Sequence, residues 1–409
     1  MKYLILLGDG MADLPIPELT MQTPLQSARK PNMDRLVRKS VCGMVKTIPD
    51  GMEPGSGPAN MSVMGYDPNT YYTGRSPLEA LSLGLDMAPD DMVFRCNLVS
   101  LSKDTDSDEY EEMTMLDYSS GEISTAESTE LIRALEKALS SDDLHFYPGR
   151  SYRHITIWQH GPASTVLTPP HDITGKNIRE YMPSGEGSDR IIRLMKASRE
   201  ILKDHPVNVR RREKGLNTAD SVWLWGQGTK PAMADFEKTY GRKGAVISAV
   251  DLIFGLGRCA GLEVIEVPGA TGNLDTNFEG KGLAAMDAFR RGLDYVYVHV
   301  EAPDECGHHG DVHGKVYSIE QIDQKILAPA FDCLENSRLE TGEPFRIMVL
   351  PDHPTPIATR THSELPVPFM LYDSSDLKDS GVECYCEAEA EKTGIRFESG
   401  PELFKAFIG

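Results

Sequence analysis

Two metal-capable side chains lie four residues apart in the stretch APDECGHHGDVHG (302–314). Asp304 and His308 follow the apolar run DYVYVHV, and one turn of helix or a tight loop would point both at one ion. Oxygen and imidazole ligands without a thiolate favour manganese, zinc or cobalt over a closed cysteine zinc site. The adjacent His309 and His313 are expected to orient the ligands by hydrogen bonds or to stay in solvent.

Further ligand-type residues follow other apolar runs of the sequence. Asp9 follows YLILL, Asp352 and His353 follow RIMVLP, and His362 comes nine residues after His353. In open α/β sheets, sites form outside the carboxyl ends of the strands, so these side chains are expected to meet there. Two clustered ions could hold the oxygens of a transferring phosphoryl group. Each motif alone also fits a turn or a helix cap, and it is their shared position after strands that favours a metal site.

A candidate nucleophile lies in the stretch GMEPGSGPANMSVMGYDP (51–68). Its glycines and prolines predict a tight exposed turn at Ser56, followed by a helix. A hydroxyl near the positive end of a helix, held by a metal, could act as an alkoxide nucleophile. A plain Gly/Ser/Pro loop is the alternative, and Ser62 is expected to lie inside the helix.

Basic residues in two places are candidates for binding an anionic substrate. Arg210 and Arg212 lie in VRRREKG, and Arg153 and His154 lie in YRH. One or two arginines could hold a phosphate or carboxylate with paired hydrogen bonds, although neighbouring arginines cannot all face one pocket. A charged segment exposed to water fits VRRREKG equally well.

Strand-like and helix-like segments alternate at both ends of the chain. Apolar runs predict buried strands at 3–7, 41–48, 221–226, 245–250, 262–268, 294–300 and 346–351. Amphipathic spacing and serine or proline starts predict helices at 33–40, 76–85, 251–261, 279–292 and 316–335. This alternation favours an α/β fold whose mostly parallel sheet has helices on both faces.

The middle of the chain lacks that alternation. Between 91 and 213 it mixes strand-like runs, a Pro/Gly-rich stretch and helices expected near 124–140 and 188–203. We therefore expect a smaller α+β domain, 91–213, inserted into a core made of 1–90 and 214–409.

Composition excludes several classes of partner. The 409 residues include 42 basic and 62 acidic side chains, a formal net charge of −20, which disfavours nucleic acid and anionic membranes. A small anionic substrate held by a local basic cluster or by metal ions remains compatible with this charge. No run approaches the roughly twenty apolar residues of a membrane span, and the start lacks a signal-peptide pattern. With seven scattered cysteines, typical of reduced thiols, this favours the cytoplasm.

The motifs together resemble the alkaline-phosphatase superfamily, and within it the archaeal-type branch of the cofactor-independent phosphoglycerate mutases. The resemblance is carried, in the family's order, by LLGDGMAD, PGSGPANMSVMGYDP, YYTGRSPLEA, APDECGH, VLPDHPTP and THSELPVPF. It implies an alkaline-phosphatase-like core with an inserted cap, and an isomerase that needs two divalent ions, manganese first with zinc or cobalt as alternatives. It also implies that 2,3-bisphosphoglycerate is not required.

The resemblance also implies roles for individual residues. Ser56 would take the phosphoryl group from 3-phosphoglycerate and return it to the 2-hydroxyl of the reoriented glycerate, beneath a cap that excludes water. One metal would bind Asp304, His308 and His362, and the other would bind Asp9, Ser56, Asp352 and His353. Gly57 stands where many relatives have an acidic residue. A homoserine kinase, or another phosphotransferase or phosphatase of the superfamily, is the alternative function.

Overall fold

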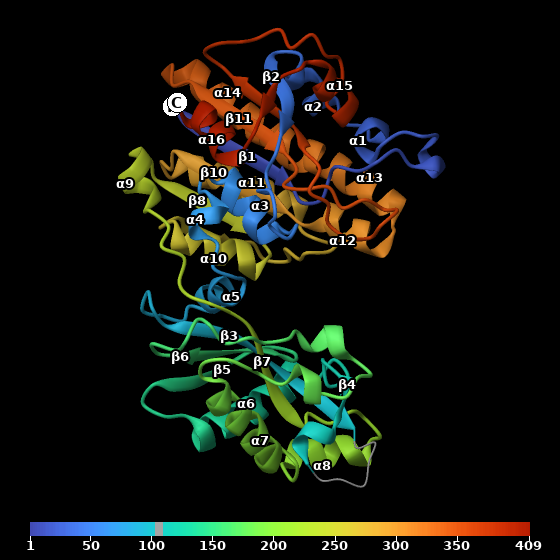
Figure 1. Cartoon of the computed structure of the whole chain (residues 1–409). Helices are drawn as coiled ribbons and strands as arrows, with labels where there is room; N and C mark the ends of the chain where they lie inside the picture. The colour runs from blue at the N-terminus through green and yellow to red at the C-terminus, as the bar shows by residue number, and fades with distance from the viewer. Residues whose placement is uncertain (103–108) are drawn as a thin grey trace. The chain divides into compact units, whose positions relative to one another are not determined.

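The computed structural model describes residues 1–102 and 109–409, which form two compact units (Figure 1). The core unit comprises Met1–Tyr72 and Met233–Gly409, and the inserted unit comprises Thr73–Ala232. The insertion is wider at both ends than the expected range 91–213. It reaches further toward the C-terminus because strand β7 (Ser221–Gly228) pairs with β3 (Met92–Ser102) in the inserted sheet.

An eight-stranded sheet forms the centre of the core unit, in the order β13-β2-β12-β11-β1-β10-β8-β9. Its strands are β1 (Lys2–Gly8), β2 (Ser40–Val45), β8 (Gly244–Ser248), β9 (Glu263–Glu266), β10 (Tyr295–Val300), β11 (Phe345–Leu350), β12 (Val367–Asp373) and β13 (Arg396–Phe397). Among the described strands of this sheet, only β12 runs antiparallel to both of its neighbours, β11 and β2. The mostly parallel α/β sheet expected from the sequence is confirmed.

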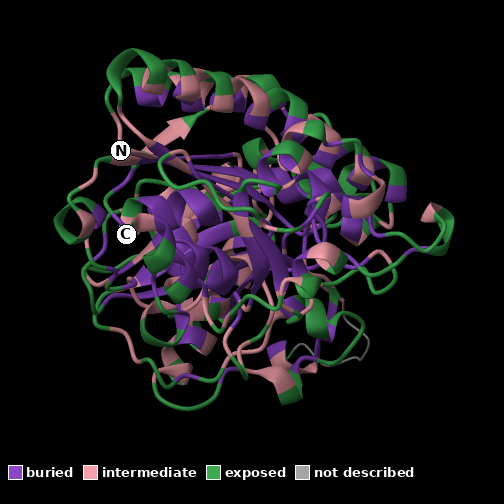
Figure 2. Ribbon diagram, turned by 90° about the horizontal axis from the view of Figure 1, so that it is seen from above, coloured by how far each residue is buried: buried purple, intermediate pink, exposed green. Residues whose placement is uncertain are grey.

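Helices cover both faces of this sheet. The helices of the core unit are α1 (Pro24–Ser27), α2 (Pro31–Val37), α3 (Ser56–Val63), α4 (Pro68–Tyr71), α9 (Phe236–Tyr240), α10 (Asp251–Cys259), α11 (Phe278–Arg290), α12 (Ala302–His309), α13 (Val312–Gln321), α14 (Ala328–Thr341), α15 (Glu387–Lys392) and α16 (Gly400–Ile408), with the 3-10 helix η1 (Pro17–Leu19) and the π-helix η5 (Ile322–Leu327). Figure 2 shows the buried strands between helices whose outer faces are exposed.

Alternation along the central strands sends side chains to opposite faces. Leu4 and Val296 belong to a buried cluster with residues of α2, α11 and α14. On the other face, the ring centroid of Tyr3 lies 5.5 Å from that of Phe407 in α16. The apolar strands are therefore enclosed on both sides.

The inserted unit is an antiparallel sheet with helices. Its strands are β3, β4 (Thr114–Asp117), β5 (Leu144–Arg150), β6 (Arg153–Trp158) and β7, and its helices and turns are α5 (Ser76–Ser82), η2 (Tyr110–Glu112), α6 (Thr125–Leu139), η3 (Pro170–Ile173), η4 (Arg179–Tyr181), α7 (Ser188–Leu202) and α8 (Pro206–Glu213). Buried residues of α6 and α7 pack against one face of the sheet, and α5 contacts β3, β6 and β7.

No helix among the described residues, 1–102 and 109–409, is long and apolar enough to cross a membrane. All seven cysteines lie in these ranges and carry free thiols.

Candidate active site

The candidate ligands gather at the carboxyl ends of three neighbouring strands. Asp9 follows β1, Asp304 lies in α12 directly after β10, and Asp352 and His353 follow β11. Since β1 pairs in parallel with both β10 and β11, residues from the two ends of the chain meet at one edge. The sheet thus assembles a polar site from segments about 350 residues apart, as the strand-end positions predicted.

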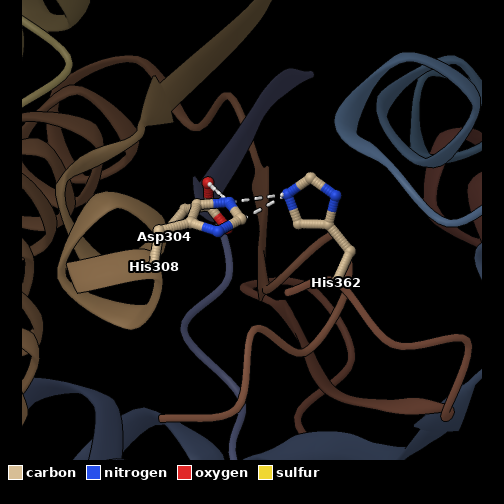
Figure 3. Close-up of side chains that lie close together, drawn as sticks. All are labelled: Asp304, His308 and His362. Carbon is tan, nitrogen blue, oxygen red and sulfur yellow. Dashed lines mark hydrogen bonds and ion pairs between the residues drawn. The ribbon is translucent and has the colours of Figure 1, made fainter. Parts of the chain in front are cut away.

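Asp304, His308 and His362 form the first cluster (Figure 3). Asp304 and His308 are one turn apart on α12, and Nε2 of His308 lies 3.2 Å from Oδ2 of Asp304. Nε2 of His362, on the loop before β12, lies 3.0 Å from Nε2 of His308 and 3.6 Å from Oδ1 of Asp304. One ligand atom from each residue therefore lies within 4.8 Å of the other two.

Carbonyl groups orient both imidazole rings of this cluster. Nδ1 of His308 lies 2.9 Å from the carbonyl oxygen of Arg360, and Nδ1 of His362 lies 3.4 Å from that of Pro54. Because a carbonyl only accepts, each Nδ1 carries a proton and each Nε2 points at the neighbouring ligands. The hydrogen bond to Asp304 raises the pKa of His308 to about 9, so a metal ion binding there would displace a proton.

Ser56, Asp9, Asp352 and His353 form the second cluster. Oγ of Ser56 lies 3.3 Å from Nε2 of His353, which is 3.5 Å from Oδ1 of Asp9 and 3.3 Å from Oδ2 of Asp352. Ser56 is the first residue of α3, so the helix begins at the serine rather than after it. The helix N-terminus therefore adds its positive partial charge beside the hydroxyl.

The electrostatics of this cluster favour a bound cation. Asp9 is fully buried, and its Oδ1 has no hydrogen-bond partner among the described residues. Burial, together with the neighbouring Asp352 and Asp304, raises the pKa of Asp9 well above its usual value. A buried carboxylate oxygen without a donor is costly, and a metal ion would supply the missing charge. The carboxylate and imidazole donors suit such an ion.

Thr355, which was not predicted from the sequence, links the two clusters. Its hydroxyl donates a hydrogen bond to Oδ1 of Asp304 and lies 3.2 Å from Nδ1 of His353. Gly10, with φ +59°, permits this close approach, because a Cβ there would lie 2.6 Å from Oδ1 of Asp304 and from Oγ1 of Thr355. The threonine in VLPDHPTP was visible in the sequence, but nothing marked it as more than a loop residue.

A buried lysine holds the two loops beneath these clusters. Nζ of Lys315 donates hydrogen bonds to Oδ2 of Asp13 at 2.6 Å, the carbonyl oxygen of Thr355 at 2.8 Å and that of Ala12 at 3.2 Å. The ammonium group therefore joins the loop after β1 to the loop after β11. Sequence reasoning missed this residue, because a lysine on an amphipathic helix is typical of an exposed surface.

Two further residues orient the acidic ligands. Nδ2 of Asn60, on α3, donates to Oδ2 of Asp352 at 2.8 Å and to the carbonyl oxygen of Ser56 at 2.9 Å. Nε2 of His299 lies 2.9 Å from Oδ2 of Asp9. His299 was missed as well, although a histidine inside the apolar strand DYVYVHV is a signal of a buried polar contact.

Gly57 follows the candidate nucleophile for a steric reason. A Cβ at this position would lie 2.7 Å from the ring of Tyr72. An acidic side chain therefore does not fit here unless the ring moves.

The inserted unit contains a separate basic and aromatic pocket of about 310 Å³, lined by Arg75, Arg95, Asn97, Tyr118, Tyr152, Arg153, His171 and Trp225. Of the four residues proposed from the sequence to bind substrate, Arg153 lines this pocket. His154 points to the opposite face of β6, because neighbouring residues of a strand alternate. It is paired with Cys96, whose cluster packs against α6 and α7.

The remaining sequence candidates lie elsewhere. Arg210 on α8 is 3.7 Å from Glu130, and Arg212 donates to the carbonyl oxygen of Lys203. His309 and His313 are exposed, and Nε2 of His313 lies 3.0 Å from Glu18. None of these four side chains contacts the two clusters or lines the basic pocket, as far as the described residues show.

Known proteins resemble the chain along its whole length. A family model described as 2,3-bisphosphoglycerate-independent phosphoglycerate mutase matches residues 37–208. The chain is 50% identical to the protein of that name from Methanosarcina mazei and 48% identical to that from Methanosarcina barkeri. These alignments cover 100% of this chain and 100% and 99% of the two relatives.

Solved structures share the fold. A protein of Pyrococcus horikoshii, 28% identical, matches with a TM-score of 0.81 over 100% of this chain and 96% of that one. The cofactor-independent phosphoglycerate mutase of Thermoplasma acidophilum, 24% identical, matches with a TM-score of 0.69 over 100% and 99% of the two chains. On the full-length identity to its relatives, the chain belongs to the family of 2,3-bisphosphoglycerate-independent phosphoglycerate mutases, which are isomerases.

Proposed function

We propose that the protein interconverts 3-phosphoglycerate and 2-phosphoglycerate without 2,3-bisphosphoglycerate, through a phosphoserine at Ser56. The observation that carries this proposal is the hydroxyl of Ser56 at the start of α3, 3.3 Å from Nε2 of His353 and beside buried carboxylates. The names of the full-length relatives supply the reaction. We propose that the protein acts in the cytoplasm. Its substrate would be a small phosphorylated acid.

Two divalent ions would occupy the site. We assign Asp304, His308 and His362 to one ion, and Asp9, Ser56, Asp352 and His353 to the other. Oxygen and imidazole donors favour manganese, with zinc or cobalt as alternatives. The bound ions would lower the pKa of the Ser56 hydroxyl and stabilise negative charge on the phosphoryl oxygens.

The residues of the chain would then act in two transfers. Oγ of Ser56 attacks the phosphorus atom, the bond from phosphorus to the glycerate oxygen breaks, and that oxygen takes up a proton equivalent to the one that Ser56 lost. After the glycerate turns, its other hydroxyl attacks the phosphoserine and restores the serine hydroxyl. Asn60 would hold the nucleophile, because it bridges the carbonyl oxygen of Ser56 and Asp352.

The basic pocket of the inserted unit supports an acidic substrate. It carries Arg75, Arg95 and Arg153 in a protein whose net charge is −20. Arg75 and Arg95 are both paired with Glu79, so Arg153 is the group that we assign to the carboxylate of glycerate. His154, Arg210 and Arg212 lie outside this pocket and are not assigned to the substrate.

A coupled assay tests the proposed function. Purified protein with manganese and no bisphosphoglycerate is expected to convert 3-phosphoglycerate to 2-phosphoglycerate, followed by conversion with enolase. The same preparation is offered homoserine and ATP in parallel. Absence of mutase turnover together with ATP-dependent phosphorylation of homoserine would replace the proposal with the kinase. Release of inorganic phosphate without isomerisation would replace it with a phosphatase.

A further inference from the structure

A second group of reactive side chains lies away from the candidate active site, where the segment before α15 packs against α2. Sγ of Cys384 is 3.2 Å from Nζ of Lys30, which is also 2.9 Å from Oδ1 of Asp34. Lys30 is only 1% exposed, whereas Cys384 is partly exposed. A buried ammonium group is thus directed at a sulfur atom that a small reagent can reach.

The surroundings of Cys384 favour its thiolate form. A hydrogen bond from Cys386 and the charge of Lys30 lower the pKa of the Cys384 thiol to about 7, against the effect of burial. Burial instead raises the pKa of Cys42 and Cys96 to about 12. Since the thiolate is the nucleophile, Cys384 is expected to react faster than the thiols in apolar surroundings.

The backbone keeps Cys384 and Cys386 close to each other. Tyr385 between them is fixed at both ends. Its backbone N–H donates to Oδ1 of Asp34 at 3.0 Å, and its hydroxyl contacts the carbonyl oxygens of Val349 at 3.1 Å and Pro368 at 2.9 Å. With the tyrosine anchored in the core, the two cysteines that flank it are held within a hydrogen bond of each other, and Cys384 contacts Lys30. An attacking thiol and a resolving thiol need this proximity.

We propose that Cys384 and Cys386 form a dithiol that reacts with hydroperoxides. The Cys384 thiolate attacks one peroxide oxygen, the O–O bond breaks, and a sulfenic acid and hydroxide form. The thiol of Cys386 then attacks the sulfenic sulfur, so that an S–S bond forms and water leaves. Peroxide is reduced by two electrons, and the two cysteines are oxidised by two. Neither cysteine belongs to the candidate active site, so this inference stands apart from the proposed function.

Alkylation of the native protein tests the role of Lys30. The folded protein is treated briefly with iodoacetamide at neutral pH, and each cysteine is quantified by peptide mass spectrometry. Cys384 is expected to react at least about tenfold faster than Cys333, which is also partly exposed, because the Lys30 ammonium group stabilises the Cys384 thiolate. Lys30→Met is expected to slow Cys384 by about tenfold, because the stabilising charge is lost.

Arg38→Met is the matched control, because Arg38 pairs with Glu383 beside the cysteine and, within the described part of the chain, does not contact its sulfur. The control is expected to leave the alkylation rate unchanged. If Lys30→Met fails to fold, Cys386→Ala takes its place, and it is expected to slow Cys384 by removing the hydrogen bond. Equal rates at Cys384 and Cys333 would overturn the proposal, as would an unchanged rate in whichever of these two variants folds.

Peroxide treatment tests the second step. Trypsin cuts after Lys378 and Lys392, so both cysteines lie on one peptide. Hydrogen peroxide is expected to remove two hydrogens from that peptide, and a thiol reductant should restore them. In Cys386→Ala, the sulfenic acid of Cys384 is expected to be trapped by a cyclic dione reagent. Recovery of both thiols intact, or oxidation only to sulfinic acid without a link, would refute the dithiol.

Discussion

Nζ of Lys315 lies 2.6 Å from Oδ2 of Asp13, and both side chains are almost completely buried. The two residues are 302 positions apart in the sequence. The same ammonium group binds the carbonyl oxygen of Thr355, whose hydroxyl contacts Asp304 and lies near His353. The ion pair therefore supports the loops that carry the candidate ligands.

Removing one partner of this buried pair should be strongly destabilising. Lys315→Met is expected to lower the free energy of unfolding by about 3–5 kcal/mol, because the Asp13 carboxylate is left without its counter-ion. Urea unfolding followed by far-UV circular dichroism measures this. Lys392→Met, which removes an exposed pair with Glu389, should change the value by less than about 1 kcal/mol. Equal effects of the two substitutions would contradict the structural role of Lys315.

The two serines of α3 should differ in function. Ser56→Ala is expected to reduce mutase turnover by at least about 10³-fold without changing thermal unfolding, because the nucleophile is lost. Ser62→Ala, further along the same helix, should retain activity. Acid quenching during turnover and peptide mass spectrometry should find phosphate on the peptide that contains Ser56. Retained activity in Ser56→Ala would exclude the phosphoserine.

The buried carboxylate of Asp9 predicts opposite effects with and without metal. In chelator-treated protein, Asp9→Asn is expected to raise the free energy of unfolding, because the amide removes a buried acid that lies beside Asp352 and Asp304. Manganese at 100 times its Kd should stabilise the unsubstituted protein by about 2.7 kcal/mol and the variant much less. Thermal unfolding with chelator or manganese checks both. An equal response to manganese in the two proteins would remove Asp9 from the ligands.

The inserted unit should lose stability in mild acid through His154. Burial lowers the pKa of His154 to about 3, whereas in the unfolded chain it titrates near 6.5. Between these values only the unfolded chain binds the proton, so stability is present above pH 6.5 and falls as the pH is lowered toward 3. The contribution of this group is a slope of up to about 1.4 kcal/mol per pH unit.

Tryptophan fluorescence can follow this effect, because Trp158, Trp223 and Trp225 all lie in the inserted unit. His154→Gln is expected to reduce the slope of the unfolding free energy against pH, between pH 6.5 and 4.5, by the contribution of about one bound proton. His160→Gln, at an exposed position, should not flatten it in this way. A slope that is the same in His154→Gln and in the unsubstituted protein would contradict the buried neutral imidazole.

Substrate affinity should depend on Arg153, which lines the basic pocket, and should not depend on Arg210 of α8. Arg153→Leu is expected to raise the KM for 3-phosphoglycerate by about 10–100-fold, the value of a hydrogen bond to a charged group. Arg210→Leu, outside the pocket, should leave KM within about twofold. Initial rates in the enolase-coupled assay measure both. A larger effect at Arg210 than at Arg153 would return the substrate contacts to the VRRREKG segment.

Much of the core and the positions of the candidate ligands could be predicted from the sequence. Apolar strands ending in Asp9, Asp304 and Asp352 implied both a parallel sheet and a shared edge, because strand direction brings those ends together. The glycines and prolines around Ser56 predicted a helix start nearby, but α3 begins at the serine itself, where the sequence predicted an exposed turn. These features depend on local pattern, which a single sequence contains.

Other features depend on contacts that local pattern does not contain. The run SVWLWG is apolar and reads as a strand, but nothing in it specifies that β7 pairs with β3 rather than with the core sheet. The reversed direction of β12 is likewise absent from its periodicity. The role of Lys315 becomes visible only when the fold brings its side chain to Asp13. Arg153 and His154 point to opposite faces of the sheet, because neighbouring side chains of a strand alternate between its two faces.

The interruption of the core unit between Tyr72 and Met233 has a consequence for synthesis on the ribosome. The inserted unit has all of its strands once residue 232 has emerged, whereas β1 must wait for its two neighbours, β10 and β11. Until Leu350 is made, the apolar strand KYLILLG lacks one of its pairing partners. The nascent chain thus exposes an aggregation-prone segment for most of translation, which is the kind of segment that chaperones bind.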